Sequence, residues 1–233
     1  MVNELFDEKV YVLKITGKAF EPENVLVLSK YRNVLEKLVL DGYKFVIIAG
    51  GGFIARKYID MARRLGIKEA FWLDEIGIRA SRLNALLLSL LLQPYSYPYP
   101  LEEISEVIDK IRINRIVVMG GLVPGQSTAT TAVEIAEAIG SKTILNAGAV
   151  DYVYTKDPAK HPDAKPLHTV KASELLKILE TRMLPGEYQL LDQHAVDIMI
   201  RSSIKMILFH YQKPEKIIQA IKGENPGTII VPE

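Results

Sequence analysis

The sequence of 233 residues contains no cysteine. This absence excludes disulfide bonds, thiolate nucleophiles, iron–sulfur clusters and cysteine-type zinc sites. The histidines are also few, and neither metal-ligand spacing nor a nucleophile partner accompanies His161, His168, His194 or His210. We therefore interpret all four histidines as structural or surface residues, and we assign no residue as a metal ligand.

The sequence also lacks an excess of charge of either sign. It has 29 Lys and Arg against 28 Asp and Glu, a formal net charge of +1. Nucleic acids and anionic membrane surfaces attract proteins through concentrated positive charge. We therefore expect no nucleic-acid partner and no membrane partner.

Long hydrophobic runs are missing as well. The longest, at residues 83–92, is interrupted by Asn84 and Ser89, and ten residues are too few to span a bilayer. The N-terminal stretch MVNELFDEKV is acidic and has no long apolar run, unlike a secretory signal. These features favour a cytoplasmic protein.

Apolar stretches rich in β-branched residues alternate with segments of helical periodicity. Strands are predicted at residues 9–15, 45–49, 115–119, 143–145, 206–209 and 228–231, with a short extended piece at 152–154. Helices are predicted at residues 23–40, 53–65, 74–92, 101–111, 127–139, 172–181, 191–202 and 214–222. The proline-rich segment 94–100 is predicted to be an extended connector. This alternation predicts a parallel sheet with helices on both faces, in a single domain with two functional halves.

Three of the predicted strands run directly into glycine-rich turns. These turns are Thr16-Gly17-Lys18, Gly50-Gly51-Gly52 and Gly120-Gly121. In an open parallel sheet, ligands bind at the carboxyl ends of the strands. Glycine lets the backbone approach a phosphate, and the N-terminus of the following helix offers free N–H donors. One such turn is usually only a tight turn, whereas three in one chain favour a phosphate-binding edge.

Positive side chains stand near these turns. Lys14, Lys18 and Arg56 are placed to contact phosphate groups. Lys14 interrupts an otherwise apolar strand, and a buried ammonium is costly unless it is paired or hydrogen-bonded. A lysine that reaches solvent from the end of the strand is an equally good interpretation of that position.

The segment 120–131 joins flexible backbone to a series of hydroxyl groups. Ser127 and Thr128 are expected to cap the helix that follows, and the same helix N-terminus can hold an anion. Asp151 and Asp157 lie in predicted loops, where each could face a metal or solvent, and single aspartates in loops are mostly solvated.

Two other nucleotide-binding patterns bear on the function. The sequence contains no GxxxxGK[ST] motif, which excludes a P-loop NTPase. Residues 50–55 satisfy G-x-G-x-x-A, so a nicotinamide-dependent oxidoreductase is an alternative. That fingerprint also requires an acidic residue about 20 positions later, at the tip of a second strand. The candidates Asp74 and Glu75 open a predicted helix instead, which weakens this alternative.

Taken together, the motifs resemble the amino acid kinase family, and most closely its archaeal-type uridylate (UMP) kinases. The likeness covers nearly the whole chain. It is carried by the order and spacing of Lys14-Ile-Thr-Gly-Lys18, Ala49-Gly-Gly-Gly52 with Ala55-Arg-Lys-Tyr58, Asp74-Glu-Ile-Gly77, Ser81-Arg-Leu-Asn-Ala85, Met119-Gly-Gly121, Pro124-Gly-Gln-Ser-Thr128 and Val153-Tyr-Thr-Lys-Asp-Pro158.

The resemblance implies an α/β fold, a three-layer α/β/α sandwich with a mostly parallel central sheet. It implies Mg²⁺-dependent transfer of the γ-phosphoryl group of ATP to UMP, giving UDP, in pyrimidine nucleotide biosynthesis. It also implies a homo-oligomer, a hexamer built from dimers. Within the single domain of residues 1–233, about 1–145 would form a UMP-binding half and about 146–233 an ATP-binding half.

The resemblance further assigns site residues by matching positions. UMP would be held by Gly51, Asp74, Leu122, Val123, Pro124, Gly125, Gln126, Ser127 and Thr128, with Asp74 accepting from the ribose hydroxyls. ATP would be held by Gly17, Lys18, Gly52, Arg56, Tyr154 and Asp157. Because two polyanions must be brought together, we expect Lys14 and Lys18 to neutralise charge during transfer and Asp151 to orient them.

The sequence departs from the family in one loop. Relatives usually have Thr-Asn-Val-Asp-Gly-Val-Tyr where residues 148–154 are Gly-Ala-Val-Asp-Tyr-Val-Tyr. The loss of two side-chain hydrogen bonds to ATP could cost about 1–3 kcal/mol of affinity. A family member with altered substrate and a non-catalytic nucleotide-binding sensor are therefore alternatives. Separately, the apolar helix near 78–92 is predicted to bury one face against a twofold mate.

Overall fold

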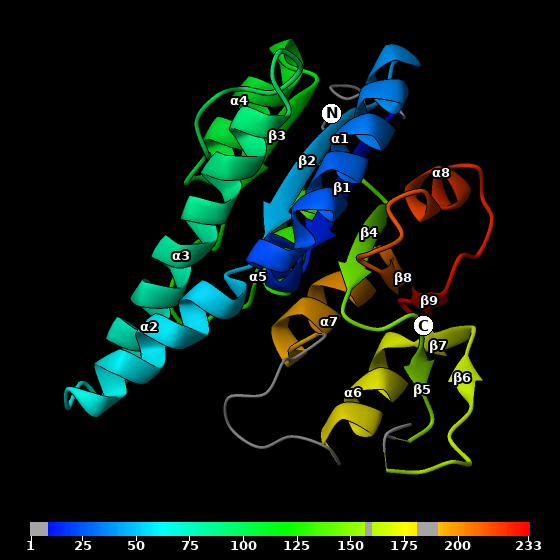
Figure 1. The fold of residues 1–233 in the computed structure, drawn as a ribbon. Helices are drawn as coiled ribbons and strands as arrows, with labels where there is room; N and C mark the ends of the chain where they lie inside the picture. The colour runs from blue at the N-terminus through cyan, green and yellow to red at the C-terminus, as the bar shows by residue number, and fades with distance from the viewer. Residues whose placement is uncertain (1–8, 157–159, 181–190) are drawn as a thin grey trace.

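The computed structural model of the chain describes residues 9–156, 160–180 and 191–233. Its main sheet has seven strands in the order β3-β2-β1-β4-β8-β9-β7 (Figure 1). These are β1 Val10–Ile15, β2 Lys44–Ala49, β3 Ile116–Met119, β4 Thr143–Gly148, β7 Thr169–Lys171, β8 Lys205–His210 and β9 Thr228–Val231. Neighbouring strands are parallel except β8 and β9, which pair antiparallel. The predicted mostly parallel sheet is therefore confirmed.

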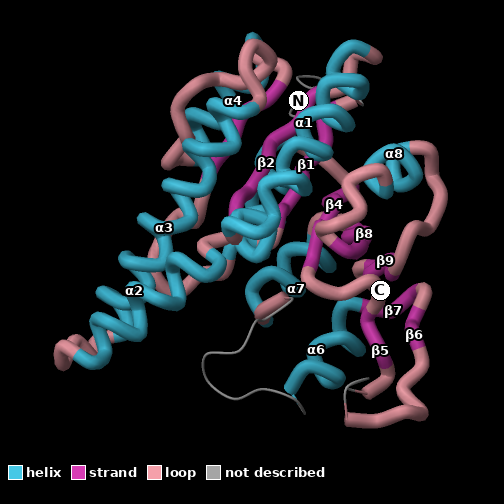
Figure 2. Tube along the Cα trace, viewed as in Figure 1, coloured by secondary structure: helices cyan, strands magenta, loops and turns pink. Residues whose placement is uncertain are grey.

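Helices cover both faces of this sheet, so the fold is the expected three-layer α/β/α sandwich (Figure 2). One layer contains α4 Ile104–Ile113, α5 Thr128–Ile139, α6 Ala172–Glu180 and α7 Gln193–Arg201. The other contains α1 Val25–Leu40, α3 Ala70–Leu91 and α8 Lys216–Ile221. Helix α2, Gly52–Arg64, packs against α3, and the pair extends beyond the sheet (Figure 1).

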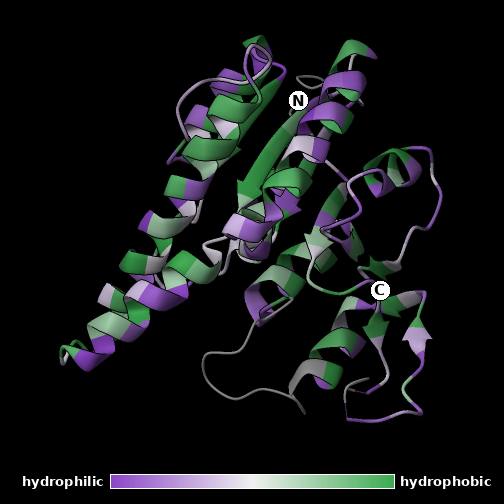
Figure 3. Cartoon of the chain, viewed as in Figure 1, coloured by the Kyte–Doolittle hydropathy of each residue, from purple (hydrophilic) through white to green (hydrophobic). Residues whose placement is uncertain are grey.

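The continuous apolar character of the strands follows from this two-sided burial (Figure 3). Successive residues of β1 point to opposite faces, so Val12 packs against the layer of α5 and α7 whereas Leu13 packs against the layer of α1 and α3. Both side chains are fully buried. Lys14 follows them in the strand, and by this alternation it faces the same layer as Val12.

Most predicted elements are confirmed to within a few residues, and β9 occupies the predicted range 228–231. Strand β4 continues to Gly148 rather than ending at 145, because Asn146-Ala147-Gly148 stays paired with β8 despite its weak strand propensity. Helix α3 begins at Ala70 rather than Asp74, so Asp74 lies inside the helix, and its carboxylate accepts from a distant loop instead of capping the helix.

Several short elements are not apparent in the sequence. A separate two-stranded sheet pairs β5, Val153–Tyr154, with β6, Pro166–Leu167, and neither β6 nor β7 was predicted. Two or three residues are too few to show a period. Short 3₁₀ helices, η2 Gly17–Phe20 and η3 Pro22–Asn24, precede α1, so α1 begins at Val25 rather than 23.

The proline-rich connector is extended, as predicted. It follows β3, with bridges from Ser96 to Ile116 and from Leu101 to Met119. Among the residues that the structure describes, no helix is long and apolar enough to cross a membrane.

Candidate active site

The turns after β1 and β2 touch each other at the carboxyl edge of the sheet. A methyl group added to Gly17 would lie 2.0 Å from the Gly52 backbone nitrogen, and Gly52 has a φ of +61°. Gly50 N–H donates to the Ile15 carbonyl at 2.9 Å. Only glycine permits this close approach of Gly17 and Gly52, so glycine is required at both turns for steric reasons. The contact brings the starts of η2 (Gly17–Phe20) and α2 to one place.

Side chains of helix α3 form hydrogen bonds with the turns after β2 and β3. The buried amide of Asn84 donates to the carbonyls of Gly50, at 2.8 Å, and Gly51, at 3.2 Å. The buried Ser81 hydroxyl accepts from Gly121 N–H at 2.8 Å. The family resemblance includes these residues, but the sequence alone suggested no role for them. The structure shows that they fix the glycine turns.

The loop between β3 and α5 is tied to α3 by Asp74 and Arg82. Asp74 Oδ2 accepts from Gly125 N–H at 2.9 Å, and Gly125 has a φ of +81°. The Arg82 guanidinium donates to the carbonyls of Gly121 and Leu122 at 3.3 and 3.2 Å. The predicted acceptor residues Asp74 and 122–128 therefore lie together, although they are about 50 positions apart in the sequence.

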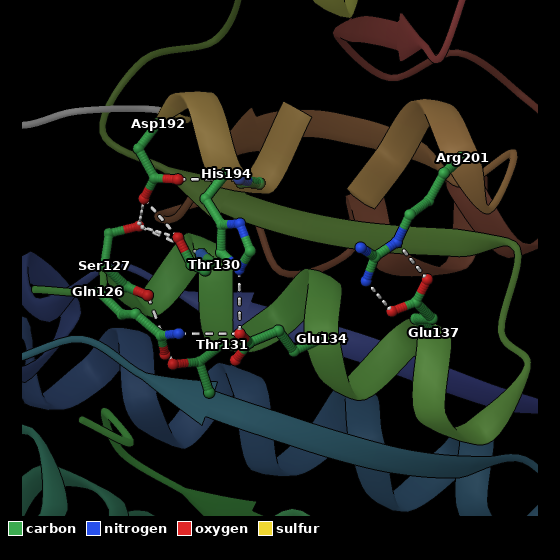
Figure 4. A network of polar contacts seen from close by, with 10 residues as sticks. Gln126, Ser127, Thr130, Thr131, Glu134, Glu137, Asp192, His194 and Arg201 are labelled. Atoms are coloured by element: carbon green, nitrogen blue, oxygen red, sulfur yellow. Dashed lines mark hydrogen bonds and ion pairs between the residues drawn. The ribbon is translucent and has the colours of Figure 1, made fainter. Parts of the chain in front are cut away.

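A polar network joins the N-terminus of α5 to that of α7 (Figure 4). Ser127 Oγ accepts from the backbone N–H of Ala129 and Thr130, which confirms the expected cap for Ser127, whereas Thr128 is the first residue of the helix. The Ser127 hydroxyl also donates to Asp192 Oδ2 at 2.8 Å, and the Thr130 hydroxyl donates to the same oxygen. Asp192 Oδ1 accepts from Ala195 N–H at 2.9 Å and so caps α7. Two helix starts thus share one carboxylate.

The same network fixes Gln126. Its Nε2 donates to Glu134 Oε1 at 2.9 Å, and Glu134 also lies 3.5 Å from His194 Nε2 (Figure 4). Farther along the two helices, Arg201 forms an ion pair with Glu137 at 2.6 Å. Hydrogen bonds from Arg201 and Ser202 hold the pKa of Glu137 below its ordinary value against the opposing effect of burial. Helices α5 and α7 are therefore joined along their length.

The two expected catalytic lysines occupy different settings. Lys14, near the end of β1, is 1% exposed, which decides between the two interpretations left open by the sequence in favour of a buried ammonium. Lys18 is exposed and lies on η2 rather than on the strand. A buried cation acts in a medium of low effective dielectric constant, so its charge is felt more strongly by a bound anion than that of an exposed one.

Asp151 lies beyond β4, where it binds two lysines that the sequence analysis did not single out. Its Oδ1 is 2.9 Å from Lys213 Nζ and 3.2 Å from Lys216 Nζ. Burial raises the pKa of Asp151, but the hydrogen bonds and charges of these lysines outweigh burial and hold it below its ordinary value. These contacts show what orients Asp151, while its expected effect on Lys14 and Lys18 stays a prediction.

His210, at the end of β8, lies beside the same charges. Burial lowers its pKa, the Asp151 carboxylate opposes this effect, and the charges of Lys213, Lys216 and Lys18 lower it further. The resulting pKa is below the ordinary value, so the imidazole stays neutral at pH 7. His210 was interpreted as structural or surface, and the structure places its imidazole within the electrostatic field of Asp151, Lys213 and Lys216.

Two of the remaining predicted ATP-side residues lie on different elements, Arg56 on α2 and Tyr154 on β5. Arg56, in the first turns of α2, pairs with Glu21 at 3.3 Å. Tyr154, on β5, packs edge-on against Tyr152, whose ring also faces His168. Asp157 lies outside the described residues.

The charged groups of this edge are mainly cationic. Within the described part of the chain, no group of three or more His, Asp or Glu side chains could hold a metal ion. Mg²⁺ in phosphoryl-transfer sites is held chiefly by substrate phosphates and water with one or two carboxylates. The residues present therefore fit a metal that arrives with a polyphosphate, and the arrangement as a whole suits two phosphate-bearing ligands placed end to end.

Comparisons with known proteins show which family the chain resembles. The sequence model of the amino acid kinase family matches residues 9–210. The uridylate kinase of Staphylothermus marinus is 47% identical over 221 residues, which cover 95% of this chain and 98% of that protein. The uridylate kinase of Sulfurisphaera tokodaii is 44% identical over 223 residues, with coverage of 95% and 98%.

Among solved structures, the crystal structure of uridylate kinase from Archaeoglobus fulgidus matches with a TM-score of 0.83 and 34% identity. The match covers 95% of this chain and 99% of that one. UMP kinase from Bacillus anthracis matches with a TM-score of 0.80 at 23% identity, which is a similarity of fold.

Proposed function

The chain belongs to the amino acid kinase family, and from this premise we propose that it is a UMP kinase that transfers the γ-phosphoryl group of ATP to UMP, giving UDP and ADP. The observation that carries the proposal is the burial of Lys14 near the end of β1, the strand that leads into the Gly17 turn in close contact with Gly52. The names of the relatives, at 44–47% identity over nearly the whole chain, support the choice of substrate.

The acceptor side would be formed by Gly51, Asp74 and the loop 122–128. The N-terminus of α5 offers backbone N–H groups and a partial positive charge to the phosphate of UMP. Asp74 is anchored to Gly125 through one carboxylate oxygen, so it can accept from ribose hydroxyls without moving the loop. We propose these groups as the UMP site.

The donor side would be formed by Gly17, Lys18, Gly52, Arg56, Tyr154 and Asp157. Lys213 and Lys216 extend the positive charge of this side near Asp151. Together these cations can neutralise the triphosphate of ATP. The half of the chain before about residue 145 would bind UMP and the half after it ATP, with the turns after β1 and β2 shared between them.

For the chemical step, the protein must mainly position the two substrates and neutralise their charge. The acceptor is a phosphate oxygen that is already ionised at pH 7, so no general base is required. The bond between the γ-phosphorus of ATP and the β,γ-bridging oxygen breaks, a bond to the UMP oxygen forms in line with it, and ADP leaves. The site must hold two anions together while charge spreads over the moving group. Lys14 is proposed to face that group, with Lys18 and the backbone N–H groups of the glycine turns beside it. Mg²⁺ bound to ATP would supply further neutralisation of phosphate charge.

We also propose that the protein works as a homo-oligomer, a hexamer built from dimers. The outer face of α3 exposes large apolar side chains, including Leu83, Leu87 and Leu90. An exposed apolar stripe on a soluble enzyme is a candidate for a subunit contact.

A coupled assay tests the function. The protein is supplied with ATP and Mg²⁺ against UMP, CMP, AMP, GMP and small carboxylates, and ADP release is followed. We expect turnover with UMP above all other acceptors. Turnover with a carboxylate and with no nucleotide would show that the protein has the function of another branch of the family. Tight calorimetric binding of UMP or UTP without UDP formation over hours would instead favour the sensor suggested by residues 148–154.

A further inference from the structure

Asn146 is the neighbour of Lys14 across the sheet. The two residues are register partners on the adjacent parallel strands β1 and β4. Their side chains project from the same face of the sheet, because Val12 and Ile144, two positions earlier on each strand, belong to one core cluster. Adjacent strands lie about 4.8 Å apart, so an amide and an ammonium placed in this way are within reach of each other.

The Asn146 amide is completely buried, and one of its polar atoms is unsatisfied. Its exposed fraction is 0%. Its Nδ2 donates to the Met206 thioether at 3.3 Å, which is a weak acceptor. Within the described residues, Oδ1 of Asn146 is one of only two buried side-chain oxygen or nitrogen atoms that have no hydrogen-bond partner. Leaving a buried acceptor unsatisfied is costly, so this oxygen requires an explanation, and a hydrogen bond made in the liganded state is one.

A neutral acceptor suits the place next to a catalytic ammonium. A carboxylate would orient the ammonium equally well, but it would cancel the positive charge that the transferred phosphoryl group requires. An amide oxygen accepts the same hydrogen bond and leaves that charge intact. The nearby carboxylate of Asp151 is itself bound to Lys213 and Lys216.

We infer that Asn146 is a positioning residue for phosphoryl transfer: its amide oxygen accepts a hydrogen bond from the Lys14 ammonium when phosphates are bound and directs that ammonium toward the transferred group. This inference rests on the proposed function, which assigns Lys14 to the reacting phosphates. No family motif quoted for this chain includes Asn146. The predicted strand ended at residue 145, so Asn146 carried no signal in the sequence, and its pairing with Lys14 is visible only in the structure.

The test uses Asn146→Leu, which keeps the approximate shape of the side chain and removes the amide. Because the unsatisfied oxygen disappears, we expect Tm to rise by about 2–4 °C. We expect kcat to fall roughly 10- to 100-fold, with the KM for UMP and for ATP changed less than about twofold. If the role of Asn146 were purely structural, the substitution would lower Tm instead of raising it. A fall in Tm that accompanies the loss of kcat would overturn the inference.

Two further variants separate charge from packing. Asn146→Asp retains an acceptor of the same shape but brings a negative charge, and we expect kcat to fall at least as far as in Asn146→Leu. Leu208→Val alters packing at the register partner of Asn146 on the other side, without changing a polar group. We expect this control to keep kcat within about twofold of the native value. Native kcat in Asn146→Asp would contradict the need for a neutral acceptor.

A spectroscopic measurement distinguishes this inference from the proposed function, because it needs no turnover. Lysine ¹⁵N–¹H correlation spectra are recorded with UMP and a non-hydrolysable ATP analogue, and with tripolyphosphate alone. A buried, hydrogen-bonded ammonium exchanges its protons slowly and is visible. We expect a signal from the Lys14 ammonium, which is assigned because it is absent from the spectrum of Lys14→Met. This signal should persist in Leu208→Val and be lost in Asn146→Leu. An unchanged signal in Asn146→Leu would overturn the inference, whereas failure to form UDP with this pattern intact would overturn only the proposed function.

Discussion

Asp192 accepts a hydrogen bond from Ser127 across 65 positions of sequence, so the start of α7 holds the start of α5. The same carboxylate binds the Thr130 hydroxyl and caps α7. The loop proposed to hold UMP leads directly into this helix start. The start of α5, next to the proposed acceptor loop, is therefore held by a residue from the C-terminal part of the chain, which the family resemblance did not assign to the site.

Asp192→Ala is expected to lower the free energy of unfolding by about 1–3 kcal/mol, because a helix cap and two hydroxyl partners are lost. It is also expected to raise the KM for UMP several-fold and to leave the KM for ATP nearly unchanged. Urea unfolding and steady-state kinetics measure these effects. Asp197→Ala is the control, since Asp197 lies on the same helix and accepts an exposed hydrogen bond from Gln193. Equal changes in the two KM values would contradict the assignment.

Lys14→Ala is expected to lower kcat by on the order of 10²-fold or more, as removal of one charge-stabilising donor does in other enzymes. The control is Lys205→Ala, at the opposite end of the sheet, where β8 begins. It should leave kcat and both KM values unchanged. A Lys14→Ala enzyme with native kcat would remove Lys14 from the chemical step.

The glycine turns and Lys14 were predictable because their signals are local. A strand that runs into glycines, and a lysine inside an apolar strand, are visible within a few residues. Asp192, Lys213 and Lys216 were not predictable in this way. Their partners Ser127 and Asp151 lie more than 60 positions away, and only the sheet order brings them together.

The boundaries of the helices and strands were also hard to predict where they depend on distant contacts. The apolar strands and amphipathic helices were predicted because the two-sided burial of a parallel sheet imposes a clear pattern. The extension of β4 through Asn146 to Gly148 was missed, because pairing with β8 overrides the low strand propensity of these residues. Asp74 was predicted to begin a helix, yet its carboxylate accepts a hydrogen bond from Gly125 N–H.

Gly17→Ala is expected to be strongly destabilising, by about 3 kcal/mol or more, and to abolish activity. The added methyl group would meet the Gly52 backbone nitrogen at 2.0 Å, and backbone cannot rotate away as a side chain can. Gly77→Ala is the matched control. Gly77 lies inside α3 with only a distant contact to Ile59 Cδ1 at 3.6 Å, so alanine should be tolerated or stabilise by up to about 1 kcal/mol. Thermal unfolding compares the two, and equal Tm values would contradict the close approach of the turns.

The pH dependence of stability is expected to include a contribution from Asp151. Its pKa is lower in the folded state than in the unfolded state, where it is near 3.9. The ionised form therefore stabilises the fold above that value, and the contribution is lost as the pH falls through the lower folded-state pKa. Asp151→Asn should reduce the free energy of unfolding at pH 5–7, and the difference from the native protein should shrink below about pH 4. Urea unfolding across this range measures it, and a constant difference would contradict the ion pairs with Lys213 and Lys216.

The outer face of α3 provides the last prediction. Leu83, Leu87 and Leu90 are 59%, 52% and 55% exposed and recur at helical spacing, so they form one apolar stripe. If a second copy of the chain covers this stripe, a charge placed in it must be buried without a partner on association. Leu87→Glu is therefore expected to shift the protein to a smaller species in sedimentation velocity at micromolar concentration, with its Tm nearly unchanged under conditions where both are monomeric. Leu40→Glu, at the 70% exposed end of α1, should leave the native assembly intact. A native protein that sediments as a monomer would show that α3 is not the contact, because nothing would then cover the stripe.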